Sequence, residues 1–468
     1  EGIRSSGQNT GAEGVGFRNT KTFRNITFRG NYIEEIFGDG IVLAEVGENG
    51  MVENNVVKNH CNYDTANYAG AWLWQCDDSI FRYNEVFGGE YGYNDGEAFD
   101  YDIGCKDIIY EYNYSHHNKG GLLLTMYDNA SYHFRYNISA NDGKPSQELF
   151  HCQTGKTKVY NNTMYIGKGT TTSIFQTGSV GYFKNNIIMV HGSVPKFGTS
   201  SISVSKGAMT NNIIYPASIT SVNGPSDAVL EDNLFVNPRL SSPQLSTKYS
   251  SEEYGLTYEN MGQGDEFIAG LRERMAIFKL QENSPAVDAG VVIPESDATE
   301  DIFGNKIVDL PDIGAHEFNN DPGPVDAEGN KAEKVILDKT ELYMATEDIA
   351  RLNASVLPED ALDDSIGWSV ADSEIVNVSA GKVTALAKGD TVVTAVSLNN
   401  PEAKAECIIH VYEKNSKSVI AVKDARVRDD GTHSGTEESM TVKLDSSGYS
   451  RNVLMSFDLT SVPENYKK

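Results

Sequence analysis

An asparagine recurs through the first half of the chain at intervals of 21–29 residues, and no other feature narrows the choice of fold as far. It closes the segments FRGN, VENN, FRYN, YEYN, FRYN, VYNN, FKNN, MTNN and LEDN, which end at Asn31, Asn55, Asn84, Asn113, Asn137, Asn162, Asn186, Asn212 and Asn233. An apolar or aromatic residue stands three positions before each of these asparagines. Short alternating strands around a turn, repeated at one period, indicate a solenoid in which each repeat forms one coil.

Asparagine suits the turn between two such strands, because it tolerates left-handed backbone and its amide can hydrogen-bond locally. Stacked coils would carry a ladder of asparagine side chains, with each amide bonded to the next. A leucine-rich repeat has a similar period, but its L-x-x-L-x-L pattern is absent. We therefore predict an all-β chain in which residues 1–247 form a right-handed parallel β-helix, with coils about 4.8 Å apart.

The residues beyond the repeats change in character. Residues 248–318 are predicted to cap the β-helix, with a short helix in 262–281 that packs its apolar stripe on the end of the solenoid. Residues 319–333 are rich in Pro, Gly and acidic residues and predict a linker. Residues 334–413 have the short alternating segments of a small Ig-like β-sandwich. Residues 419–468 begin another β domain, too short for a complete jelly roll, so we expect a truncated jelly-roll-like segment.

The composition argues against several classes of partner. The chain has 39 Lys and Arg against 66 Asp and Glu, which gives a formal net charge of −27. Nucleic acid and anionic membranes are therefore not expected to bind, and no apolar run is long enough for a membrane span. A length of 468 residues predicts two or more domains. The chain begins with Glu and shows no signal peptide, as expected for a mature or excised fragment.

The asparagine-turn coils resemble the pectate-lyase-like right-handed β-helix superfamily of carbohydrate-active enzymes. The segments SPAVDAG, DIFGN and PDIGAHEF within residues 284–318 are similar to the segment that often closes such helices. WSVADSEIVNVSAGKVTALAKGDTVVTA resembles the bacterial Ig-like group 2 domain, and DARVRDDGTHSGT with YSRNVLMSFDL resembles the start of a DNRLRE-type carbohydrate-binding domain. These resemblances imply a secreted or cell-surface bacterial protein, expected as a monomer, that acts on a polysaccharide or oligosaccharide. The superfamily includes lyases, hydrolases, esterases and adhesins, so the reaction stays open.

The segment DGEAFDYD at residues 95–102 concentrates ionisable groups. Residues two apart on a strand share a face, so Asp100 and Asp102 point one way and Phe99 and Tyr101 the other. We expect the aromatic pair to fill the core, because the opposite register would bury two carboxylates. A solvated surface is the ordinary explanation for such a pair, but the number of acidic, histidine and aromatic neighbours favours a site.

Coil stacking brings residues of several repeats to this site. The predicted catalytic residues are Asp100, Asp102, Glu97, His116 and His151. The predicted substrate-binding residues are Trp72, Trp74, Tyr91, Tyr93, Asp95 and His117. Aromatic rings stack on the apolar faces of sugars, and carboxylates bind sugar hydroxyls. As structural alternatives, the tryptophans would belong to the core and the adjacent histidines would fill a turn.

Two reactions and a binding role fit these residues. Glycoside hydrolysis needs an acid and a second carboxylate, and Asp95, Glu97 or Glu90 would also serve as the partner. A neighbouring carboxylate would raise the pKa of the acid. β-Elimination needs a base and a cation such as Ca²⁺, which clustered carboxylates bind, but the cluster lacks a clear basic residue. We rank a glycoside hydrolase first, a calcium-dependent polysaccharide lyase second, and a non-catalytic carbohydrate-binding adhesin third. For the hydrolase, no cofactor is certain and no residue is predicted to bind a metal.

Overall fold

The computed structural model describes residues 15–457, except for 63–66, 92–94, 127–130, 154–156, 177–181, 199–207, 222–223, 225–228, 231, 249, 251–252, 325–331, 358–360, 362–363, 399, 414–420, 429–432 and 435–450. Side chains are described between Arg24 and Glu413. The chain forms two compact units, which are described separately. The first contains the repeats and the segment that follows them, and the second contains most residues from Ile336 onwards.

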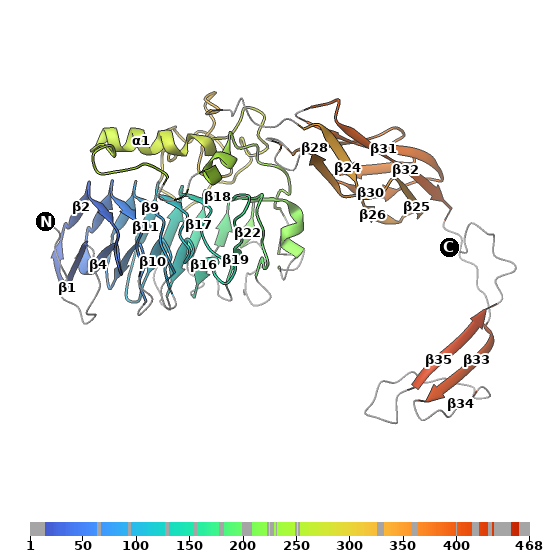
Figure 1. Ribbon diagram of the computed structural model, residues 1–468, viewed down its shortest axis with the longest axis horizontal. Helices are drawn as coiled ribbons and strands as arrows, with labels where there is room; N and C mark the ends of the chain where they lie inside the picture. The colour runs from blue at the N-terminus through green and yellow to red at the C-terminus, as the bar shows by residue number, and fades with distance from the viewer. Residues whose placement is uncertain are drawn as a thin grey trace. The chain divides into compact units, whose positions relative to one another are not determined.

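The first unit is a parallel β-helix built from three sheets, which confirms the fold predicted from the repeat (Figure 1). The first sheet contains β1 (Val15–Arg24), β4 (Ile41–Glu48), β7 (Ala71–Trp74), β10 (Phe99–Tyr101), β13 (Leu123–Thr125), β16 (Glu148–Cys152) and β19 (Ser173–Phe175). The second contains β2 (Thr27–Arg29), β5 (Met51–Glu53), β8 (Ile80–Arg82), β11 (Ile108–Glu111), β14 (Tyr132–Arg135), β17 (Thr157–Tyr160), β20 (Tyr182–Lys184) and β22 (Met209–Thr210). The third contains β3 (Tyr32–Glu34), β6 (Val56–Lys58), β9 (Glu85–Phe87), β12 (Tyr114–His116), β15 (Ile138–Ala140), β18 (Thr163–Ile166), β21 (Ile187–Val190) and β23 (Ile213–Tyr215).

The predicted asparagine ladder runs along the turn between the second and third sheets. Each side-chain Nδ2 from Asn31 to Asn212 donates to the Oδ1 of the next ladder asparagine, over 2.8–3.1 Å. We predicted left-handed backbone at the ladder asparagine itself, and this was wrong. The left-handed residue is the one before each ladder asparagine, where φ lies between 51° and 69°. The corner thus falls one residue earlier, and the asparagine amide is left to bond along the stack.

We expect the ladder to contribute strongly to stability where it is buried. Asn113 donates to Phe81 O and Asn137 Oδ1, and its own Oδ1 accepts from the backbone and side chain of Asn84. The Asn113→Ala variant leaves these partners unsatisfied in the core and should lower the free energy of unfolding by about 3 kcal/mol. The half-buried first rung is the control, because the Asn31 side chain bonds only to Asn55 among the described residues, and Asn31→Ala should cost about 1 kcal/mol. Urea titration would measure both variants, and equal losses would contradict this account.

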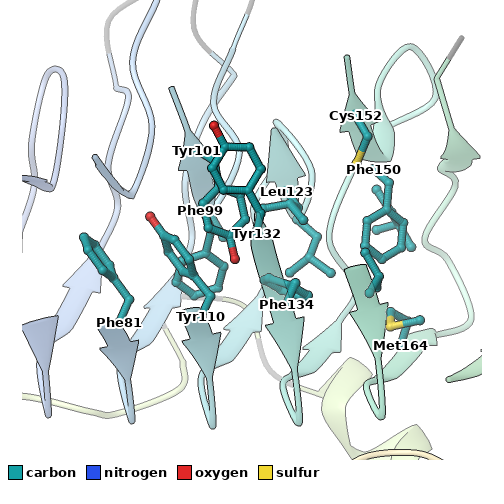
Figure 2. Close-up of a cluster of buried hydrophobic side chains, with 14 of the residues drawn as sticks. Phe81, Phe99, Tyr101, Tyr110, Leu123, Tyr132, Phe134, Phe150, Cys152 and Met164 are labelled. Carbon is teal, nitrogen blue, oxygen red and sulfur yellow. The ribbon is translucent and has the colours of Figure 1, made fainter. Parts of the chain in front are cut away.

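Aromatic side chains fill the interior of the β-helix, where residues at equivalent positions of successive coils lie on one another (Figure 2). Phe81 stacks on Tyr110 of the next coil with ring centroids 4.5 Å apart, and Tyr101 of the first sheet stacks on Tyr132 of the second sheet at 4.7 Å. The core thereby takes up the inward-facing residues of β10. The residues that alternate with them on this strand must face outward.

The segment after the repeats packs along the flank of the β-helix rather than on its end. Its helices are η2 (Pro243–Lys248), α1 (Asp265–Met275) and η3 (Ala276–Phe278), whereas η1 (Ala217–Ser221) lies within the repeats and contributes Ile219 to the core of the β-helix. Phe267, Leu271 and Met275 of α1 are completely buried, and the Phe278 ring lies beside those of Tyr114 and Tyr165 on the third sheet. The prediction of an end cap was wrong because a helical apolar stripe shows that a helix packs but not on which face. Figure 1 shows α1 on the side of β9 and β18, with β4, β10 and β16 of the first sheet on the opposite side.

The second unit consists of small sheets with their own core around Val393, Cys407 and Ile409. The strands in this part of the chain are β24 (Lys334–Leu337), β25 (Glu341–Ala345), β26 (Ile349–Arg351), β27 (Ala354–Leu357), β28 (Ile366–Val370), β29 (Val376–Ser379), β30 (Lys382–Ala385), β31 (Gly389–Ser397) and β32 (Lys404–Tyr412). A separate three-stranded sheet joins β33 (Ala421–Arg428), β34 (His433–Ser434) and β35 (Arg451–Phe457). Its likeness to a carbohydrate-binding domain stays a prediction. In the part of the chain that is described, no helix has the length and apolarity needed to cross a membrane.

Candidate active site

The outer face of the first sheet carries a row of side chains from four successive coils. In register along it lie Trp72, Asp100, Leu124 and His151. Phe99 and Tyr101, on either side of Asp100 in β10, are completely buried in the core. The direction predicted for Asp100 is therefore confirmed, because it points away from the core, whereas Asp102 follows directly after the end of the strand.

Five carboxyl groups interact around this row. Burial, and then the charges of Asp102, Glu97, Asp95 and Asp39 in that order, raise the pKa of Asp100 well above its ordinary value. Burial and the charge of Glu97 raise the pKa of Asp95 to about 7. Burial also raises the pKa of Asp39 to about 7. Carboxyl groups held partly protonated near neutral pH are what acid catalysis requires.

The carboxyl groups differ in their access to solvent. Glu97 is completely buried and Asp100 is only 7% exposed, whereas Asp95 and Asp102 are half-buried. Burial raises the pKa of Asp102, but the Ile103 N–H donates to its Oδ1 at 2.6 Å and favours the carboxylate. Asp95 and Asp102 therefore reach the surface in different environments, one favouring the acid and the other accepting a backbone hydrogen bond.

Four buried polar atoms lie in this region without a hydrogen-bond partner among the described residues: Glu97 Oε1, Asp100 Oδ1, His151 Nδ1 and Gln153 Oε1. The His151 Nδ1 approaches Glu97 Oε1 to 3.5 Å, and its Nε2 lies 3.1 Å from Gln153 Nε2. Glu97 is otherwise held by the Gly96 N–H at 3.0 Å. Buried polar groups are normally hydrogen-bonded, so four atoms without a hydrogen bond, two of them linked only by the long His151–Glu97 contact, indicate a place where a polar ligand or water binds.

Two of the predicted aromatic residues lie near the carboxyl groups: Trp72 is paired with Asp100 across the sheet, and the charges of Glu97 and Asp95 act on Tyr91. Trp72 and Trp74 alternate with the buried Ala71 and Leu73, and are therefore not core residues. The Tyr91 ring lies under the Lys144 ammonium group, 3.0 Å from the ring centroid. Tyr93 lies outside the described residues.

His116 and His117 belong to a different surface from the aspartates. His116 is buried on the third sheet, where its ring stacks on Phe87 and its Nε2 lies 3.4 Å from Glu85 Oε1. His117 follows in left-handed backbone, with its Nδ1 2.9 Å from His116 Nδ1. Both histidines lie near the acidic segment in sequence, but one coil passes through all three sheets. The structure therefore does not bring them to the acidic site.

Two residues of this region were not among the predicted site residues. Asp39 accepts a hydrogen bond from Trp72 Nε1 at 2.9 Å, although 33 residues separate them. Gln153 lies two residues after His151 and bonds to its ring. The repeat period was the available signal for Asp39, because a residue about one period before Trp72 falls on the adjacent coil. Among the described residues, no three or more His, Cys, Asp or Glu side chains are arranged to hold a metal ion.

Comparison with known proteins gives one family match and one curated relative. Residues 331–407 match the bacterial Ig-like domain (group 2), so the chain is a parallel β-helix protein that also carries a bacterial Ig-like domain. A lacto-N-biosidase of Bifidobacterium longum subsp. longum is 29% identical over 315 residues, which cover 63% of this chain. The match spans only 19% of the length of that relative.

Two solved structures are also similar. The crystal structure of a GH136 lacto-N-biosidase from Eubacterium ramulus is 23% identical, over 45% of this chain and 28% of that chain, with a TM-score of 0.27. The crystal structure of pectate lyase Pel9A is 12% identical, over 66% of this chain and 86% of that chain, with a TM-score of 0.27.

Proposed function

We propose that this chain is part of a secreted or cell-surface bacterial glycoside hydrolase that cleaves an oligosaccharide at the outer face of the first sheet. The observation that carries the proposal is the pair of half-buried aspartates, Asp95 and Asp102, in a cluster of five interacting carboxyl groups. The likeness to the Bifidobacterium lacto-N-biosidase supports this class of reaction. It also makes lacto-N-biosides the proposed substrates.

Asp95 is the proposed general acid. Its pKa of about 7 leaves it largely protonated in mildly acidic solution and about half protonated at neutral pH. It would give its proton to the glycosidic oxygen as the bond to the anomeric carbon breaks, so that the leaving sugar departs as an alcohol. The charge of buried Glu97 beside it favours the protonated form.

Asp102 is the proposed second carboxylate. Burial raises the pKa of Asp102, and the hydrogen bond from Ile103 N–H to its Oδ1 opposes that effect by favouring the carboxylate. As an anion it would stabilise the positive charge that develops on the sugar ring, and would either attack the anomeric carbon or activate a water. Asp100 is almost buried and interacts with the other four carboxyl groups of the cluster. We therefore assign it a supporting role and not direct contact with the sugar.

The test is hydrolysis of p-nitrophenyl lacto-N-bioside, followed by release of nitrophenol. A panel of neutral and uronate-containing polysaccharides would be assayed in parallel for reducing ends and for the ultraviolet absorbance of unsaturated uronates. Nitrophenol release would support a lacto-N-bioside hydrolase. Reducing ends from another neutral polysaccharide alone would keep the reaction class and reject the substrate, and unsaturated product would reject hydrolysis.

The acid role of Asp95 predicts the pH dependence of turnover. Only the protonated Asp95 can act as acid, and its pKa of about 7 means that the proton is lost as the pH rises through that value. We therefore expect kcat to fall above about pH 7, by about tenfold for each further pH unit. The Glu97→Gln variant should move this alkaline limb to lower pH, because it removes a charge that raises the pKa of Asp95. A limb that stays in place or moves upward in this variant would contradict the assignment.

A further inference from the structure

Trp72 is held on the outer face of the first sheet by a carboxyl group that belongs to the preceding coil. Asp39 Oδ1 accepts from the indole Nε1 at 2.9 Å and from the Ala69 N–H at 3.1 Å. The indole nitrogen is a donor only, so this bond uses its polar capacity within the protein and fixes the ring in one orientation. The half-buried indole can then meet a ligand only through its apolar surface.

The position of Trp72 relative to the carboxyl groups is set by strand pairing. Trp72 in β7 lies directly opposite Asp100 in β10, and Asp102 N donates to the carbonyl of Leu73 at 3.0 Å. Neighbouring strands of a sheet are about 4.8 Å apart, close to the length of one sugar ring. A sugar chain lying along the axis of the β-helix would therefore place consecutive rings over consecutive coils.

The coils on the two sides of β10 offer different chemistry. Towards the N-terminus, the adjacent coil carries Trp72. Towards the C-terminus, Leu124 comes first and His151 with Gln153 follows, where buried polar atoms lack a partner among the described residues. One side thus suits the apolar face of a sugar ring, and the other suits its hydroxyl or amide groups.

We propose that Trp72 is the platform for the sugar ring next to the one that is cleaved, and that Asp39 is the positioning residue that orients this platform. The inference rests on the proposed function, because the cleaved ring is placed at Asp95 and Asp102. It adds that the oligosaccharide lies along the axis of the β-helix, and that a disaccharide binds through two adjacent coils.

Intrinsic fluorescence tests the platform without relying on turnover. The protein has three tryptophans, Trp72, Trp74 and Trp368, and the last lies in β28 of the Ig-like region, outside the proposed site. In the Trp368→Phe protein, titration with the disaccharide lacto-N-biose should give a saturable change in tryptophan emission. The same titration with each of its component monosaccharides measures the affinity of a single ring.

Two substitutions at the platform and one matched control separate the roles. Trp72→Leu and Asp39→Ala should each weaken lacto-N-biose binding at least tenfold, and should change monosaccharide binding less than threefold. Asp39→Asn keeps an oxygen acceptor for the indole, so it should weaken disaccharide binding less than threefold. Isothermal calorimetry would follow binding where the emission change is lost, and the thermal midpoint would confirm that each variant is folded.

Each outcome decides between the parts of the argument. Equal losses for Asp39→Asn and Asp39→Ala would overturn the positioning role, because the charge and not the acceptor would then matter. Equal weakening of disaccharide and monosaccharides by Trp72→Leu would overturn the adjacent-ring platform. Hydrolysis of p-nitrophenyl lacto-N-bioside with an unaltered KM in Trp72→Leu would retain the proposed function and reject this inference. Disaccharide binding through Trp72 without any hydrolysis would do the reverse.

Discussion

Replacing either Asp95 or Asp102 by asparagine is expected to lower kcat/KM for p-nitrophenyl lacto-N-bioside by about a thousandfold, the size typical of a lost acid or base. Asparagine cannot donate the acidic proton that Asp95 supplies. Nor can it carry the negative charge that Asp102 holds against the developing positive charge of the sugar. Both side chains are half-buried and keep their shape in these variants, so the loss should come from chemistry rather than from unfolding.

Asp100→Asn is the comparison that separates contact with the sugar from support of the site. Asp100 is nearly buried, and its environment already favours the protonated, neutral form. A neutral amide of the same shape should therefore lower kcat/KM by less than about tenfold. If Asp100→Asn instead loses as much activity as the other two, the proposed pair is incorrect and Asp100 is one of the catalytic carboxyl groups. Circular dichroism of all three variants would show whether the fold is retained.

Replacing Arg274 by methionine is expected to cost about 3–5 kcal/mol of folding stability, because it leaves a buried charge without its partner. Glu85 is completely buried, and the Arg274 guanidinium contacts its carboxylate at 2.5 and 3.0 Å. The hydroxyl of Tyr254 also donates to this carboxylate at 2.7 Å. These contacts join α1 and the preceding segment to the third sheet, so their loss should detach the flank from the β-helix.

The Arg272→Met variant is the matched control on the same helix. Arg272 donates to a backbone carbonyl, that of Ile302, and pairs with no buried carboxylate among the described residues, so its loss should cost about 1 kcal/mol. Adding Glu85→Gln to Arg274→Met should recover part of the loss, because it removes the unpaired charge. Thermal and urea unfolding of the full chain would measure all three, and similar losses for the two arginines would show that the buried pair is not decisive.

The same pair predicts sensitivity to acid. Burial alone would raise the pKa of Glu85, but the charge of Arg274 and the hydrogen bond from His116 outweigh it and lower the pKa to about 2. A carboxyl group with a depressed pKa stabilises the fold above its unfolded pKa, near 4.5, and this stability is lost as the pH falls towards 2. The wild-type chain should lose this contribution in that window, and Arg274→Met should lose much less.

The sequence predicted the β-helix well because its information is periodic. Each repeat places an apolar residue and an asparagine at fixed offsets, and the observed ladder from Asn31 to Asn233 uses every asparagine that the pattern identified. The outward direction of Asp100 followed from its alternation with Phe99 and Tyr101, although the carboxyl group is nearly buried on the outer face, which the cost of burying charge did not predict. These inferences depend only on neighbours along one strand or on equivalent positions of stacked coils.

The site was less predictable because nearness in sequence is a poor guide in a coiled chain. His116 lies 16 positions after Asp100, but on the third sheet, under Tyr254. Asp39 lies 61 positions before Asp100, but its charge acts on that residue. The face of the β-helix on which α1 packs could not be predicted either. The strands of the third sheet that carry the tyrosines in contact with this segment have the same sequence pattern as strands exposed to solvent. The sequence of a single repeat does not show which face of the β-helix a later segment covers.

The spacing of the ladder has a consequence for how such a protein can be altered. The intervals from Asn55 to Asn84 and from Asn84 to Asn113 are 29 residues, whereas the next two are 24 and 25. The hydrogen bonds between the ladder asparagines hardly change in length across these coils. The additional residues therefore belong to the connections on either side of the first sheet. The scaffold therefore tolerates loop grafting. Exchanging the segment between β6 and β7 for that of another β-helix should alter the sugar that is accepted, because this exchange leaves Asp95 and Glu97, which lie between β9 and β10, in place.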